Sequence, residues 1–105
     1  MDPGEIGVSS ITAAELVYGV TKSGSKRNCD ALDAFLLPLE VVDFDRSAAL
    51  KYGEIRTLLE VKGRLIGPMD MLIAAHAKSL GVTLVTNNLR EFRRVPELIV
   101  KNWAV

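Results

Sequence analysis

The sequence has a single cysteine, few aromatic residues and no net charge. Because Cys29 stands alone, an intrachain disulfide is excluded. The 13 basic and 13 acidic residues cancel, so any contact with nucleic acid must come from a local patch rather than from a global basic field. No apolar run approaches the roughly 20 residues of a membrane span, and the N-terminus lacks the basic and apolar regions of a signal peptide. These absences favour a cytoplasmic protein with no membrane contact.

The chain is long enough for one ordinary core. Its 105 residues are 49% apolar and 25% charged, which is typical of a single globular domain spanning residues 1–105. Short β-branched runs alternate with longer segments of helical spacing, and this alternation predicts strands covered by helices. We therefore expect an α/β fold, a three-layer α/β/α domain with a small, mostly parallel sheet.

Punctuating residues place the expected elements. Thr12 and Glu15 match a capping box, Asp45 matches an N-cap, and Pro68 suits the first position of a helix. Gly63 and Gly81 suit the residue that follows a helix. We expect helices at residues 12–21, 26–37, 46–62 and 68–80, and strands at residues 6–9, 39–44, 82–85 and 98–103.

Polar residues gather where a helix begins and a strand ends. Asp70 falls in the first turn of the apolar helix 68–80, and Thr86, Asn87, Asn88 and Glu91 follow the next strand. In α/β sheets these two places meet at the edge where ligands bind, so we expect the residues to converge there.

Each candidate has a structural alternative. Glu15 fits a capping box, and Asp70 fits the positive end of a helix dipole. Asn87 and Asn88 are also typical of a turn, and Glu91 of a solvated helix. His76 shares an apolar stripe and is expected in the core rather than at the site.

Three segments resemble a known family. They are SSITAAELVYG at residues 9–19, GPMDMLIAAHA at residues 67–77 and VTNNLREF at residues 85–92. In this order they are similar to the PIN domain, and in particular to the VapC toxins of bacterial toxin–antitoxin pairs. The resemblance covers essentially the whole chain.

The resemblance implies a metal-dependent endoribonuclease. It implies Mg²⁺ or Mn²⁺ as cofactor, RNA as substrate, a cognate antitoxin protein as partner and a homodimer. Glu15 matches the helix glutamate of the family's carboxylate cluster, and Asp70 matches the aspartate of its Gly-Pro-x-Asp helix. The metal ligands implied are Glu15, Asp70, Asn87 and Glu91, and the substrate contacts implied are Thr12, Arg64, Thr86, Asn88 and Arg90.

The chain departs from the family pattern at its start. Family members open with a strand ending in Asp-Thr-Asn, whose aspartate is the central metal ligand, followed by a helix. Neither is found here, so the domain is expected to be N-terminally short, with Ile6–Ser9 and Val82–Val85 flanking the place of that strand. Two functions stay open: an endoribonuclease toxin, and a catalytically impaired PIN scaffold that only dimerises or binds the antitoxin.

Overall fold

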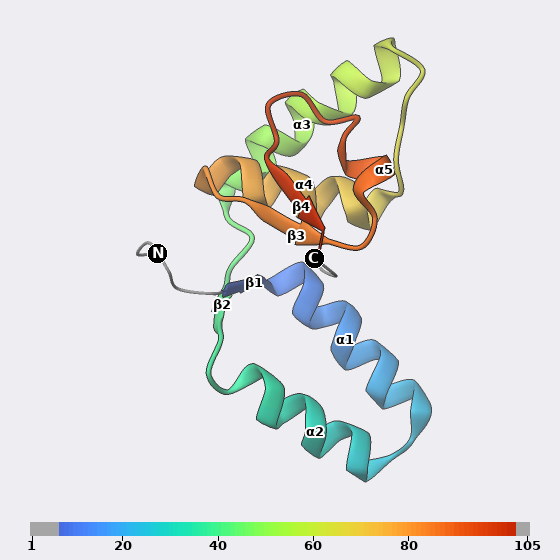
Figure 1. The fold of residues 1–105 in the computed structure, drawn as a ribbon, viewed down its shortest axis with the longest axis vertical. Coiled ribbons are helices and arrows are strands. Elements are labelled where there is room, and N and C mark those ends of the chain that lie inside the picture. Colours follow the sequence, from blue (N-terminus) through green and yellow to red (C-terminus); the bar gives the residue numbers. More distant parts are fainter. Residues whose placement is uncertain (1–6, 103–105) are drawn as a thin grey trace. The chain divides into compact units, whose positions relative to one another are not determined.

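The structure is a computed structural model that describes residues 7–102 (Figure 1). It divides the chain into two compact units, Met1–Asp43 (unit 1) and Phe44–Val105 (unit 2). Each unit contains helices and one pair of parallel strands, which confirms the predicted α/β class. The expectation of one domain over the whole chain stays a prediction.

Unit 1 is a parallel strand pair joined by two helices. Val8 lies opposite Val41 in the pair, and α1 contacts both α2 and the strands. Neither helix buries a residue completely. The elements are β1 (Gly7–Ser9), α1 (Ser10–Ser23), α2 (Lys26–Leu36) and β2 (Glu40–Val42).

The first helix begins earlier than the sequence pattern predicts. Ser9 is the N-cap, and its Oγ accepts a hydrogen bond from the backbone N–H of Ile11 at 3.1 Å. A start at Thr12 is therefore wrong, because the serine that ends β1 already satisfies a free N–H of the helix. Glu15 consequently lies in the second turn, where it cannot complete a capping box.

Unit 2 carries the longer helices and the second strand pair. β3 runs parallel to β4, with Leu84 opposite Val100 and Thr86 opposite Asn102. The elements are α3 (Arg46–Val61), α4 (Pro68–Leu80), β3 (Leu84–Thr86), α5 (Leu89–Phe92) and β4 (Val100–Asn102).

The predicted boundaries of α3 and α4 are confirmed by their terminal residues. Asp45 Oδ1 accepts a hydrogen bond from the N–H of Ala48 at 3.0 Å, and Pro68 occupies the first helical position. Gly63 and Gly81 follow the two helices with φ angles of 64° and 68°. A side chain at either position would be strained in this left-handed conformation, which explains the glycines.

The core of unit 2 lies between α3 and α4. Ala74 and Ala75 of α4 are fully buried, and Leu59 of α3 is fully buried beside them. His76 is 2% exposed, and its ring makes an edge-to-face contact with Phe44 at 5.5 Å between centroids, which confirms its predicted place in the core. None of the helices within residues 7–102 combines the length and apolar character that crossing a bilayer requires.

The strands differ most from the sequence prediction. Every described strand is three residues long, and β3 begins at Leu84 rather than Val82 because the first residues after Gly81 complete the helix end. The four strands form two separate pairs instead of the one sheet that was expected. The sequence did not predict α5 either. Ile6 and Trp103, both expected in strands, lie outside the described residues.

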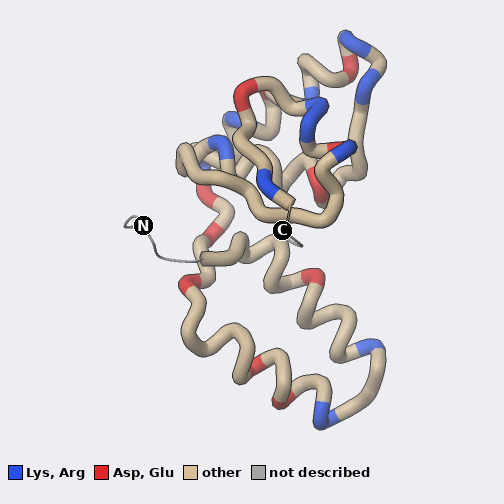
Figure 2. The backbone as a smooth tube through the Cα atoms, in the orientation of Figure 1, with Lys and Arg blue, Asp and Glu red and all other residues tan. Residues whose placement is uncertain are grey.

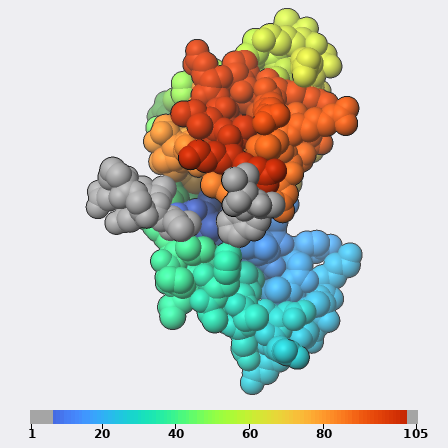
Figure 3. Space-filling view, viewed as in Figure 1, coloured from blue at the N-terminus to red at the C-terminus, as the bar shows by residue number. Residues whose placement is uncertain are grey.

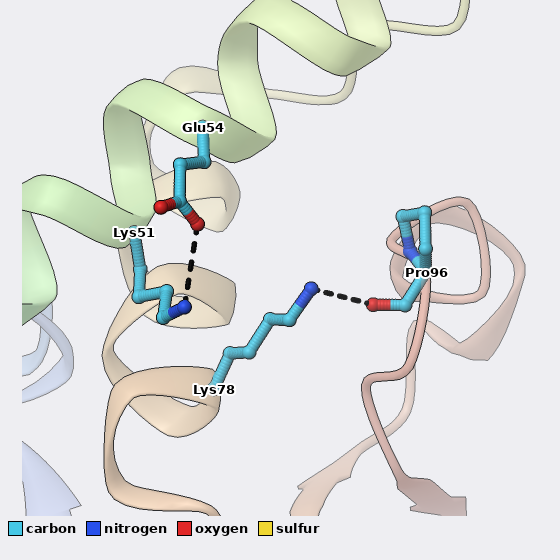
Figure 4. Close-up of polar contacts among 4 residues, drawn as sticks. All are labelled: Lys51, Glu54, Lys78 and Pro96. Atoms are coloured by element: carbon cyan, nitrogen blue, oxygen red, sulfur yellow. Dashed lines mark hydrogen bonds and ion pairs between the residues drawn. The ribbon is translucent and has the colours of Figure 1, made fainter.

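The loop between α5 and β4 is held by a lysine. Lys78 Nζ donates a hydrogen bond to the carbonyl oxygen of Pro96 at 3.0 Å, whereas Lys51 pairs with Glu54 on α3 (Figure 4). The next residue, Glu97, has a φ angle of 62°, which glycine adopts without strain but a glutamate does not. The backbone of this turn is therefore strained at Glu97, whose side chain is exposed.

We predict that Glu97→Gly raises the free energy of unfolding by about 0.5–1 kcal/mol and that Glu97→Val lowers it, because a β-branched residue is least tolerated at positive φ. Urea unfolding of the two variants measures the difference. Equal stabilities for glycine and valine at position 97 would show that the backbone is not strained there.

The position of Glu15 yields a second stability prediction. Ser9→Ala should lower the free energy of unfolding by about 1 kcal/mol, because it removes the N-cap. Glu15→Ala should change it by less than about 0.5 kcal/mol, because an exposed residue in the second turn has no capping role. Thermal and urea unfolding compare the two, and a larger loss for Glu15→Ala would restore the capping explanation for this residue.

Candidate functional site

Asp70 is positioned by the start of α4. It is the third residue of the helix and half-buried, with Gly67 as the N-cap. A Cβ built on Gly67 would lie 3.5 Å from Asp70 Oδ2 and 3.9 Å from its Cγ. The absence of a side chain at residue 67 therefore keeps one side of the carboxylate open. The positive end of the helix dipole also stabilises negative charge at this position.

The polar residues after β3 fall at the same edge of unit 2. α4 ends at Gly81 and the chain turns back into β3, so the start of α4 and the end of β3 share one edge. Thr86 ends the strand, and its Oγ1 accepts a hydrogen bond from the N–H of Asn88 at 3.0 Å. This hydrogen bond supports the interpretation of Asn88 as a turn residue. The side chains of Asn87 and Asn88 are exposed.

The remaining unit 2 candidates lie on two neighbouring segments. Arg90 and Glu91 belong to α5, where Arg90 is exposed and Glu91 is half-buried. Arg64 is exposed in the connection between α3 and α4. A hydrogen bond from Arg94 Nη1 to the carbonyl oxygen of Leu65, 2.9 Å long, joins this connection to the end of α5. The structure thus brings the two segments together beside the start of α4.

Thr12 and Glu15 belong to unit 1. Both lie on α1, Thr12 in the first turn and Glu15 in the second, with Glu15 exposed. Because Glu15 has no capping role, the capping box no longer competes with the metal-binding role proposed for this residue. Its convergence with Asp70, which lies in unit 2, stays a prediction.

The described acidic residues fit one mode of Mg²⁺ binding. Within residues 7–102, no three His, Cys, Asp or Glu side chains are grouped closely enough to enclose a metal ion. Mg²⁺ commonly binds through one or two carboxylates and completes its shell with waters and substrate phosphates. Asp70, with an open side above Gly67, fits that mode rather than an all-protein cage.

The distribution of charge was not anticipated from the net charge of zero. Unit 1 contains seven acidic and three basic residues, a net charge of −4, and unit 2 contains six acidic and ten basic residues, a net charge of +4. Unit 2, which carries Asp70, is therefore the part of the chain that attracts anions. The sequence alone did not predict the boundary between the two units, so it did not predict this separation of charge.

Comparison with known proteins identifies the family. The family model described as PIN domain matches residues 1–98, which span both units. The chain is 54% identical over 99 residues to Ribonuclease VapC2 of Rickettsia felis, covering 93% of this chain and 74% of that protein. It is 47% identical over 98 residues to the tRNA(fMet)-specific endonuclease VapC of Salmonella typhimurium, covering 92% and 74%.

Solved structures agree with the sequence matches. The crystal structure of VapBC2 from Rickettsia felis bound to a promoter DNA fragment contains a chain that matches this one with a TM-score of 0.88 at 52% identity, covering 94% of this chain and 75% of that chain. The DNA-bound VapBC of Salmonella typhimurium matches with a TM-score of 0.85 at 47% identity, covering 90% and 73%. The predicted α/β fold of the PIN type is therefore confirmed, and this chain belongs to the PIN domain family.

Proposed function

We propose that this chain is a metal-dependent endoribonuclease that hydrolyses RNA phosphodiester bonds as the toxin of a toxin–antitoxin pair. The observation that carries the proposal is the similarity, over more than nine-tenths of the chain, to proteins named ribonucleases and endonucleases. The position of Asp70 at a helix start, with an open side above Gly67, agrees with a nuclease site. We place its action in the cytoplasm, where RNA is available.

The metal assigned to the site is Mg²⁺ or Mn²⁺, held by Glu15 and Asp70 with contributions from Asn87 and Glu91. When bound, such an ion neutralises charge on the phosphate and activates the attacking water. Asp70 is suited to holding it because α4 is fixed in the core on one face and presents the carboxylate at its first turn. Carboxylate and amide oxygens are the ligands that hard divalent ions prefer.

RNA contacts are assigned to polar side chains around the same edge. Thr86 and Asn88 lie at the turn after β3, and Arg64 and Arg90 lie on the neighbouring connection and helix. Thr12 is the candidate contact from α1. Hydroxyl and amide groups hydrogen-bond phosphate and sugar, and arginine adds charge, so this set can position a strand without reading its sequence.

An antitoxin is the protein partner that we propose. The matching structures from Rickettsia felis and Salmonella typhimurium are of VapBC, in both cases bound to DNA. We also propose a homodimer. The helices of unit 1, whose surface is drawn in blue and teal in Figure 3, expose large apolar side chains that a partner surface would cover. They are Leu16, Val17, Tyr18 and Phe35.

We predict that Asp70→Asn and Glu15→Gln each lower the rate of Mg²⁺-dependent RNA cleavage by about 100-fold, because each removes a charged ligand while keeping the side-chain size. The matched control is Glu54→Gln, which removes an exposed carboxylate paired with Lys51 on α3. Gel analysis of a labelled RNA gives the rates. Loss of cleavage in Asp70→Asn alone, with Glu15→Gln unaffected, would remove Glu15 from the site. Absence of cleavage by the unsubstituted chain, with antitoxin binding intact, would favour the scaffold function.

Gly67 provides a test that does not depend on cleavage. We predict that Gly67→Ala weakens Mn²⁺ binding by about tenfold, because the new methyl group would lie 3.5 Å from Asp70 Oδ2 and cover that side of the carboxylate. The φ of −55° and ψ of 146° at residue 67 suit any amino acid, so the variant should fold. Electron paramagnetic resonance of free Mn²⁺ measures the affinity. Unchanged affinity would mean that the ion does not approach Asp70 from the side of Gly67.

A further inference from the structure

Five basic side chains of unit 2 lie on two segments that the fold joins. One segment is the connection between α3 and α4, and the other is α5 with the residues after it. Figure 2 shows basic positions along both. The hydrogen bond of 2.9 Å from Arg94 Nη1 to the carbonyl oxygen of Leu65 ties the segments to each other. We call this set the basic surface: Lys62, Arg64, Arg90, Arg93 and Arg94.

Packing fixes the orientation of α5 under the basic surface. Phe92 is 3% exposed and Val95 is 2% exposed, so this side of the short helix faces the core. Arg90 and Arg93 are both exposed and are three residues apart, which places them on one side of a helical turn. Arg94 then uses its guanidinium to hold the neighbouring connection. Arg90 and Arg93 are therefore presented on a fixed support, and one hydrogen bond from Arg94 fixes the connection that carries Lys62 and Arg64.

The charges of the basic surface are not neutralised by the acids near it in sequence. Glu60, the acid nearest to Lys62, is bound by Arg56, whose Nε lies 2.9 Å from Glu60 Oε1. This hydrogen bond, together with one to Tyr52, raises the pKa of the Arg56 guanidinium. Within residues 7–102, none of the five side chains of the basic surface forms an ion pair of 4.0 Å or less. The basic surface thus keeps its positive charge for a partner.

We propose that the basic surface binds consecutive phosphates of the RNA backbone and holds the strand against the edge that carries Asp70. The inference rests on the proposed function and extends it from the two predicted contacts, Arg64 and Arg90, to a continuous surface. Four of its five members are arginines, whose planar guanidinium groups match phosphate oxygens. A polyanion is favoured over a neutral ligand because unit 2, which carries the basic surface, has a net charge of +4.

The test measures RNA binding in the absence of cleavage. The full chain with Asp70→Asn is titrated into a fluorescein-labelled single-stranded RNA of mixed sequence at several salt concentrations. Because each phosphate contact contributes about 0.7 to the slope of log K against log salt, Arg64→Gln/Arg93→Gln should reduce the slope by about 1.4. The same substitutions should weaken binding at low salt by about tenfold. The charge-matched control, Lys26→Gln/Arg27→Gln on α2, should leave the slope unchanged.

The outcomes separate this inference from the proposed function. An unchanged slope in Arg64→Gln/Arg93→Gln overturns the inference. It is also overturned if this variant loses antitoxin binding while RNA binding stays intact, because the surface would then be an interface for an acidic protein segment. Arg64→Lys/Arg93→Lys keeps the charge and should keep most of the slope. If the double glutamine variant does not fold, each single variant should show half of the change. Salt-dependent binding through these residues, in a chain that shows no cleavage with Asp70 present, would refute the proposed function and leave the inference standing.

Discussion

The contact between α3 and α4 is the interaction on which unit 2 depends. These two helices share the most extensive contact of the described part of the chain, and it is closed by fully buried Leu59 facing Ala74 and Ala75. Small side chains on α4 allow the helix backbones to approach closely, so Leu59 and Ile55 of α3 are buried against it. β3, β4 and α5 pack onto this pair through Leu84, Val100 and Phe92. Loss of this contact would leave β3 and β4, each of only three residues, with no helix surface to pack against.

The same contact explains how a charged residue can be held at a defined position. α4 has five buried residues after its first turn, and this burial fixes the helix rotation. Asp70 lies in that first turn, where the chain emerges from the core and the helix dipole favours negative charge. A site on a rigid helix is more accurately positioned than one on a loop, and the desolvation cost of the carboxylate stays moderate because the residue is only half-buried. Apolar burial in the body of α4 and the candidate carboxylate at its start are therefore separated along one helix.

The sequence predicted those elements whose ends are marked by local chemistry. A helix end is set by local interactions at Asp45, Pro68 and Gly81. Each of these residues acts through its own backbone conformation or through a hydrogen bond to a residue at most four positions away, so its effect does not depend on the rest of the fold. Prediction of Thr12 as a helix start was wrong because Ser9 offered an equally good cap three residues earlier. α5 has four residues, too few for a helical period to show. Strand pairing is set by contacts distant in sequence, which is why two separate pairs were not foreseen.

The candidate site was predictable in its residue types but not in its electrostatic setting. Asp70 could be found because a carboxylate follows Gly-Pro at a helix start, a pattern that needs no tertiary information. The basic surface could not, because Arg64 and Arg94 are thirty positions apart and become neighbours only through the hydrogen bond between Arg94 and Leu65. A net charge of zero suggested a neutral protein, whereas the fold sorts the same charges into an acidic and a basic unit. For a protein acting on a polyanion this sorting matters more than the total, since screening limits the effect of any charge to about 8–10 Å. Cations within that range of a bound polyanion would therefore contribute most to its attraction, and acids beyond that range would add little repulsion.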